Sequence, residues 1–397
     1  MDRSTAVETA LRAGAPHTLL EIVKTAMAEQ YGADRVELRL ADYAMRSLQV
    51  VAPAPSAGSV PIHDSPQGRV FGTQEPLVVR DGATGRADVH LPVTIRGDRM
   101  GVLTVGMPQD RLGGSVLPEL QNICEALGHE ILVADRDTDL YVLARRAARL
   151  TLAAEMQWQL LPGRACFRAE FSLGAHLEPA YAVLGDNYDW SVSADALTLT
   201  ITNGMGQGID AALLSNLTVN ALRNARRAGL DLAGQAALAD QAVYAQHQGR
   251  VHVSVLLLRF TLATGQVEVI EAGSPQAWRM SRGVVTPLAF DAQLPLGMFE
   301  DTEYVPEYFT VREGDRLLFA SDGVYEAQSS AGERYGDRAL ARSLAATRLL
   351  PAPQVPDAVL RELRTYHGDV PLDDDALVVC LDWHGPSAGN AGPQGPR

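Results

Sequence analysis

Four short segments combine acidic or amide side chains with glycine or with one another at places where buried strands are expected to end or begin. They are Gly185-Asp186-Asn187-Tyr188-Asp189, Asn203-Gly204-Met205-Gly206-Gln207-Gly208, Ser321-Asp322-Gly323 and Asp373-Asp374-Asp375. Tight turns at strand ends can bring carboxylates together from distant parts of a chain, and hard divalent cations take oxygen ligands of this kind. Water bound to such cations has a lowered pKa and can attack phosphorus. The set could therefore hold divalent cations whose bound water acts on phosphorus.

The elements that must position these segments belong to a strand-rich region at 163–384. Apolar runs predict buried strands at 197–201, 251–260, 266–271, 316–320 and 376–381. Apolar residues at helical spacing predict helices over 209–247, 336–349 and 355–366. Strands and helices in this proportion indicate an α+β fold for the region that carries the four segments.

The first part of the chain predicts a separate α+β domain. Helical spacing covers 17–31, and strand patterns are found at 36–40, 77–80, 89–95 and 100–105. Gly97-Asp98, between the last two strands, is typical of a hairpin turn. The stretches HLPVTIRGDRMGVLTVGMP and LPELQNICEALGHEIL resemble a GAF sensor domain. We therefore expect a GAF-like domain at 1–118.

A helical linker is expected at 119–162, because apolar spacing predicts continuous helix from 117 to 161. After a polar break at 135–139, apolar residues resume a mostly three-four spacing at Leu140, Leu143, Ala147, Leu150, Ala154 and Leu161. Such a stripe is typical of a coiled-coil seam, which would join two copies of the chain as a homodimer. The alternative is two ordinary amphipathic helices that pack on the flanking domains.

Composition and charge disfavour several other classes of protein. The 397 residues include 34 basic and 48 acidic side chains, so the net charge of −14 disfavours nucleic-acid and anionic membrane partners. The three cysteines, at 124, 166 and 380, lack the spacing of a zinc site. The sequence has neither an apolar signal core nor about 20 consecutive apolar residues. We expect a cytoplasmic protein with a disordered Gly/Pro-rich tail at 385–397.

One Asp-Gly pair alone indicates only a turn. In this chain, however, the order of the four segments, the spacing between them and the residues that flank them all match one family. The region from 150 to 383 resembles the PPM metal-dependent serine/threonine protein phosphatases, in their SpoIIE-like bacterial branch. The stretches that carry the resemblance are QLLP at 159–162, GDNYDW at 185–190, NGMGQG at 203–208, LPLGMF at 294–299, GDRLLFASDGVYEA at 314–327, GERYG at 332–336 and DDDALVV at 373–379.

This resemblance implies an α-β-β-α sandwich of two antiparallel sheets with two Mn²⁺ or Mg²⁺ ions at one end. By position, Asp186, Asp322 and Asp374 would be the metal ligands that act through a metal-bound water, and the backbone carbonyl of Gly204 would be another ligand. Asp375 takes the place of Asp374 if the alignment is shifted by one residue. The implied substrate is phosphoserine or phosphothreonine on a regulatory protein, such as an anti-sigma factor antagonist.

The sequence departs from the family at the start of the glycine loop, where the family has an Asp that bridges both metal ions and this chain has Asn203. An amide is neutral and offers one good oxygen acceptor beside an NH₂ group that cannot ligate. Ser274 also stands where the family commonly has the His of an Ala-Gly-His triplet. Two functions therefore follow: a sensor-regulated phosphatase that retains activity, or a pseudophosphatase that binds a phosphoprotein without turnover.

Overall fold

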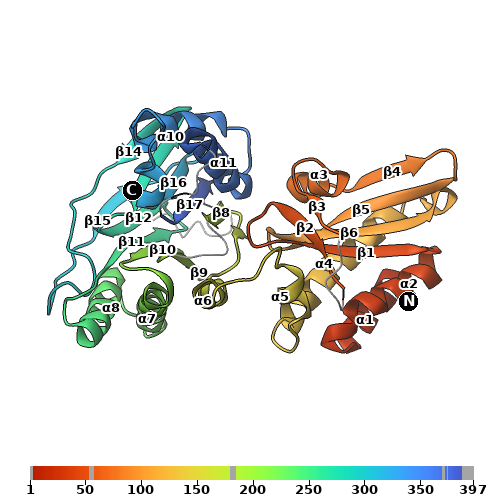
Figure 1. Cartoon of the computed structure of the whole chain (residues 1–397), viewed down its shortest axis with the longest axis horizontal. Coiled ribbons are helices and arrows are strands. Elements are labelled where there is room, and N and C mark those ends of the chain that lie inside the picture. Colours follow the sequence, from red (N-terminus) through yellow and green to blue (C-terminus); the bar gives the residue numbers. More distant parts are fainter. Residues whose placement is uncertain (1–2, 53–57, 179–184, 369–371, 373, 387–397) are drawn as a thin grey trace, which may run out of the picture. The chain divides into compact units, whose positions relative to one another are not determined.

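The computed structural model describes residues 3–52, 58–178, 185–368, 372 and 374–386. The chain divides into two compact units, Met1–Arg149 and Leu150–Arg397 (Figure 1). Asp373 and the part of the predicted tail from 387 onward lie outside the described residues. None of the helices in the described ranges is long and apolar enough to cross a membrane.

The first unit is built on an antiparallel sheet whose described strands run in the order β3-β2-β1-β6-β5-β4. These strands are β1 (Arg35–Ala41), β2 (Ser47–Val50), β3 (Val60–Pro61), β4 (Leu77–Asp81), β5 (Arg86–Ile95) and β6 (Asp98–Pro108). One face packs on α1 (Arg3–Ala13), α2 (Leu19–Tyr31) and α4 (Val116–Ala134), and α3 (Pro66–Thr73) lies on the other.

The predicted hairpin between the last two strands of this unit is confirmed. Arg96 and Gly97 both have positive φ angles, 48° and 89°, at the turn between β5 and β6. Such a turn matches the right-handed twist of the paired strands, which explains why a glycine is needed there. The GAF-like assignment of this unit stays a prediction.

The predicted continuous helix from 117 to 161 is wrong, because the segment forms three helices: α4, α5 (Leu140–Ala144) and α6 (Leu152–Leu160). Helix α4 lies in the core of the first unit, whereas α6 packs on a helix of the second unit. Thr151 begins α6 by accepting a hydrogen bond from the backbone of Ala154 at 3.2 Å. Leu143 is 56% exposed and Leu150 only 7%. The apolar stripe from Leu140 to Leu161 therefore does not form one continuous coiled-coil seam, and the homodimer stays a prediction.

The second unit contains two antiparallel sheets that face each other across one core. Their described strands run β15-β12-β11-β10-β9 and β14-β13-β16-β17-β8-β7. The bounds are β7 (Ala165–Phe167), β8 (Phe171–Glu178), β9 (Asp186–Val192), β10 (Ala196–Gly204), β11 (Val253–Thr261), β12 (Gln266–Ala272), β13 (Gln276–Ser281), β14 (Val284–Leu288), β15 (Glu307–Thr310), β16 (Arg316–Ala320) and β17 (Ala376–Trp383). Leu199, Phe260, Phe319 and Val379 are among the buried side chains that both sheets contribute to the core.

Helices cover the outer faces of both sheets, as Figure 1 shows, so the predicted α-β-β-α sandwich is confirmed. The five-stranded sheet carries α7 (Gly208–Arg227) and α8 (Leu232–His247), and the six-stranded sheet carries α10 (Tyr335–Ala346) and α11 (Val355–His367). The single helix predicted at 209–247 is divided in two, because Gly229 adopts a positive φ of 81° and Asp231 caps α8.

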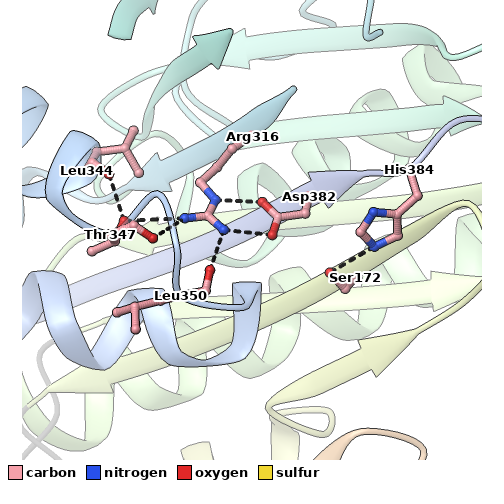
Figure 2. Close-up of polar contacts among 7 residues, drawn as sticks. All are labelled: Ser172, Arg316, Leu344, Thr347, Leu350, Asp382 and His384. Carbon is pink, nitrogen blue, oxygen red and sulfur yellow. Dashed lines mark hydrogen bonds and ion pairs between the residues drawn. The ribbon is translucent and has the colours of Figure 1, made fainter. Parts of the chain in front are cut away.

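Arg316 of β16 ties the six-stranded sheet to the end of α10 (Figure 2). Its guanidinium group forms two hydrogen bonds to the carboxylate of Asp382 on the neighbouring β17, at 2.6 and 2.8 Å. It also donates to the backbone carbonyls of Thr347 and Leu350, at 2.7 and 2.6 Å. Since Arg316 is buried, one side chain satisfies a carboxylate and two carbonyl groups that follow a helix.

We expect Arg316→Met to lower the free energy of unfolding of the second unit by about 2–3 kcal/mol, because Asp382 and two carbonyls lose their partner. The exposed Arg338 of α10 offers a matched control, and Arg338→Met should change stability by less than about 0.5 kcal/mol. Denaturant unfolding followed by tryptophan fluorescence measures this, because all four tryptophans lie in the second unit: Trp158, Trp190, Trp278 and Trp383. Equal stability of the two variants would contradict the role given to Arg316.

Candidate functional site

The candidate site lies at the end of the sandwich where β9 begins and β10 ends. These strands pair so that Asp186 stands opposite Asn203. Tyr188 and Ile201 of the same strands point into the core between the sheets, so alternation places Asp186 and Asn203 on that inner face. Gly185 permits this close approach, because a Cβ atom there would lie 2.1 Å from the carbonyl oxygen of Gly204.

Asp375 and Asp374 reach the site from the start of β17 and have different environments. Asp375 is buried, and its carboxylate accepts hydrogen bonds from the backbone N–H groups of Gly185 at 2.9 Å and Asp186 at 3.3 Å. Asp374 is exposed, and its carboxylate accepts from the backbone N–H of Asp375 at 2.8 Å. Asp375 therefore holds the turn before β9, and Asp374 faces the outside of the site.

Asp322 joins the site from the six-stranded sheet, because it follows β16 and begins the short helix α9 (Asp322–Tyr325). One carboxylate oxygen accepts from the backbone N–H of Gly323 at 3.0 Å and from the side-chain amide of Asn203 at 2.7 Å. The same amide nitrogen donates to the hydroxyl of Ser274 at 3.3 Å. Asn203 thus links the two sheets across the site, and it acts as a donor toward Asp322.

Negative charge accumulates around Asp186. Burial raises the pKa of the Asp186 carboxyl well above its ordinary value, the neighbouring Asp375 raises it further, and Asp322 and Asp374 add to the effect, while a hydrogen bond with Ser321 opposes it. Partial desolvation of its carboxyl group, together with the nearby Asp322, also raises the pKa of Asp374, although the residue as a whole is exposed. One oxygen of the Asp186 carboxylate has no hydrogen-bond partner among the described residues, although the side chain is only 2% exposed.

A buried carboxylate with a free oxygen and three acidic neighbours has the donor chemistry of a site for a hard divalent cation. Over the described ranges, no three His, Cys, Asp or Glu side chains are grouped closely enough to hold a metal ion by themselves. The carboxylates therefore fit such an ion in donor type, and the amide oxygen, backbone carbonyls and water must supply the remaining ligands.

A cavity of about 640 Å³ opens beside this group of carboxylates. Asp322 and Asp374 form part of its wall, and the wall continues through Glu326, Ser329, Ser330 and His367. His367 comes from the end of α11 and is held by a 2.9 Å hydrogen bond between its ring Nδ1 and the backbone carbonyl of Gln328. The carboxylates of Asp322 and Asp374 are thus open to this cavity.

All of the predicted site residues are at this end of the sandwich, but they differ in what they contact. Gly204 is placed by a 3.2 Å hydrogen bond from its N–H to the carbonyl of Gly185. Sequence reasoning missed Gln157 and Ser215, whose side chains donate to the backbone carbonyls of Asp186 and Gly185. Since each contact joins residues far apart in the chain, no local pattern marks them.

Comparisons with known proteins identify relatives of this chain. The sequence profile of the family described as Stage II sporulation protein E (SpoIIE) matches residues 193–384. The chain is 24% identical over 208 residues to Stage II sporulation protein E of Bacillus subtilis, which is 51% of this chain and 24% of that protein. It is 22% identical over 186 residues to phosphoserine phosphatase RsbU of the same organism, which is 47% of this chain and 56% of that protein.

The chain thus spans about a quarter and about half the length of these two relatives. Among solved structures, the SiaA PP2C domain of Pseudomonas aeruginosa superposes with a TM-score of 0.50 at 22% identity, over 58% of this chain and 94% of that domain. That likeness shows the fold alone, and the fold is the one predicted from the glycine-rich motifs. Residues 193–384, which make up most of the second unit, therefore match the family described as Stage II sporulation protein E (SpoIIE).

Proposed function

We propose that the second unit is a metal-dependent protein phosphatase that hydrolyses phosphoserine or phosphothreonine on a regulatory protein. The observation that carries this proposal is the buried carboxylate of Asp186, with Asp375 behind it and with Asp322 and Asp374 beside an open cavity. The relative RsbU is by name a phosphoserine phosphatase, which supports the class of substrate.

The metal would be held by Asp186, with Asp322, Asp374 and the backbone carbonyl of Gly204 as further ligands. When bound, Mn²⁺ or Mg²⁺ supplies a water of lowered pKa and positive charge toward the phosphate. The chain's own residues prepare the site, because Asp375 fixes the backbone of Asp186 and the cavity admits the phosphorylated residue. Because Asn203 is neutral, we expect a second ion to bind weakly.

The substrate we propose is a phosphorylated regulatory protein, such as an anti-sigma factor antagonist, and the first unit is the sensor that regulates its dephosphorylation. The net charge of −14 disfavours a nucleic-acid substrate. The cavity wall combines hydroxyl groups of Ser329 and Ser330 with the carboxylate of Glu326, which suits the polar backbone and side chains next to a phosphoserine.

A second candidate function is that of a pseudophosphatase, which binds the phosphoprotein without hydrolysing it. One observation favours it: the amide of Asn203 donates a 2.7 Å hydrogen bond to Asp322, so that a neutral donor occupies an oxygen that a metal ion would need. In this alternative the hydrogen bond stabilises the site without metal, and the fold serves recognition only.

The Asn203→Asp variant separates the two functions. The new carboxylate restores the charge that bridges two metal ions in the family, so we expect Mn²⁺-dependent hydrolysis of a phosphoserine peptide to rise at least tenfold, about 1.4 kcal/mol. Without metal the variant should melt at a lower temperature than wild type, because Asp322 then faces a second carboxylate. Asn224→Asp, on the exposed side of α7, adds the same charge away from the site and serves as the control.

Two other outcomes of this experiment have clear meanings. If wild type hydrolyses the peptide readily and Asn203→Asp is no faster, Asn203 does not occupy the bridging position. Wild type that shows no turnover at any Mn²⁺ concentration, yet binds its phosphoprotein partner, would establish the pseudophosphatase function instead.

Asp322 should contribute directly to metal binding. We expect Asp322→Ala to weaken Mn²⁺ binding at least tenfold in isothermal titration calorimetry, because a carboxylate ligand is lost. Asp337→Ala removes an exposed carboxylate at the start of α10 and should leave the affinity unchanged. Equal affinities for wild type and Asp322→Ala would exclude Asp322 from the metal site.

A further inference from the structure

The backbone of Asp186 is held by side chains instead of by a neighbouring strand on one of its sides. Among the described residues, β9 is the edge strand of the five-stranded sheet and pairs with β10 alone, so its outer backbone groups need other partners. At Asp186 the N–H donates to the carboxylate of Asp375, and the carbonyl accepts a hydrogen bond from the side-chain amide of Gln157. Gln157 belongs to α6 and is 3% exposed.

Gln157 lies in a polar layer between the sheet and its covering helices. Asn187 and Thr202 stand opposite each other on β9 and β10, and alternation turns both away from the core between the sheets. On that same outer face, Arg223 of α7 bonds to Asp189 of β9 and to the end of α6, at 2.8 and 2.7 Å. Helices α6 and α7 therefore cover Asn187 and Thr202, and both side chains are buried.

The polar side chains of this layer do not increase the stability of the fold. The amide oxygen of Gln157, both polar atoms of Asn187 and the hydroxyl of Thr202 have no hydrogen-bond partner among the described residues. Buried polar groups in this state cost stability, and an apolar side chain of similar volume at position 157 would remove one such group. The favourable polar contact that Gln157 does make is the one to the Asp186 carbonyl. The contact that distinguishes a glutamine from an apolar residue at this position is therefore the one with Asp186.

We infer that Gln157 is a positioning residue for the metal site, which fixes the peptide of Asp186 and thereby the direction of its carboxylate. The inference rests on the proposed function, because it assigns Asp186 to metal binding. Gln157 from α6 and Asp375 from the start of β17 hold the carbonyl and the N–H of this one residue. With the N–H and the carbonyl of Asp186 both fixed, its carboxylate can move only about the two side-chain torsions. Less conformational entropy is therefore lost when a cation binds.

Metal affinity tests this role, because among the described residues Gln157 does not line the cavity and bonds to the backbone of Asp186, not to its carboxylate. In the full-length chain we expect Gln157→Met to raise the Kd for Mn²⁺ about tenfold or more in isothermal titration calorimetry. The KM for a phosphoserine peptide at saturating Mn²⁺ should stay within twofold of wild type. The metal-free protein should melt within about 3 °C of wild type, since an unsatisfied polar group is lost together with the hydrogen bond.

The matched control is Gln159→Met on the same helix, where the side chain is exposed, and its Kd should equal that of wild type. Gln157→Asn provides a second variant that keeps the amide but is one methylene too short to reach the Asp186 carbonyl, and we expect the same loss of affinity. A Kd within twofold of wild type for both folded Gln157 variants would overturn the inference and leave the proposed function intact. Failure of wild type and Gln159→Met to bind Mn²⁺ would overturn the proposed function, and this inference with it.

Discussion

Repulsion between carboxylates at one end of the β sandwich governs how the second unit is built there. Asp186 is almost fully buried, and burial together with its acidic neighbours raises the pKa of its carboxyl. The chain offsets part of this cost with neutral donors: backbone N–H groups bond to Asp375, and the N–H of Gly323 and the amide of Asn203 bond to Asp322. Each bond stabilises an anion but also engages an oxygen that a cation would otherwise coordinate.

These donors reach the carboxylates because the backbone segments are closer together than side chains would allow. A Cβ atom at Gly185 would lie 2.1 Å from the carbonyl oxygen of Gly204, and one at Gly323 would lie 2.0 Å from that of Asp375. Glycine at these positions is thus required by close approach of backbone to backbone, and Gly185 in addition has a φ of 136°. The Asp and Gly residues recur together in the motifs for one physical reason. The Asp residues supply the charge, and the Gly residues let the backbone segments that carry it come close together.

The family resemblance predicted the sandwich, and the candidate site residues that it named do lie at one end of it. Apolar runs at 197–201, 316–320 and 376–381 correspond to β10, β16 and β17, because buried strands carry their signal locally. The prediction of a continuous helix at 117–161 was wrong, because the breaks in this helix depend on long-range packing. Apolar spacing does not show that successive helical turns pack on different units. The contact of Gln157 with Asp186 joins residues 29 positions apart and leaves no periodic trace in the sequence.

Asn203 and Gly204 form an Asn-Gly dipeptide, in which the glycine nitrogen can attack the asparagine side chain because glycine has no Cβ to hinder it. The ring that results opens to Asp or iso-Asp. Here the N–H of Gly204 is engaged with the carbonyl of Gly185 at 3.2 Å, and β10 holds both residues extended between β9 and β11. Cyclisation requires a backbone conformation that this ladder excludes. The paired strands therefore protect the amide of Asn203 against this reaction while the unit stays folded.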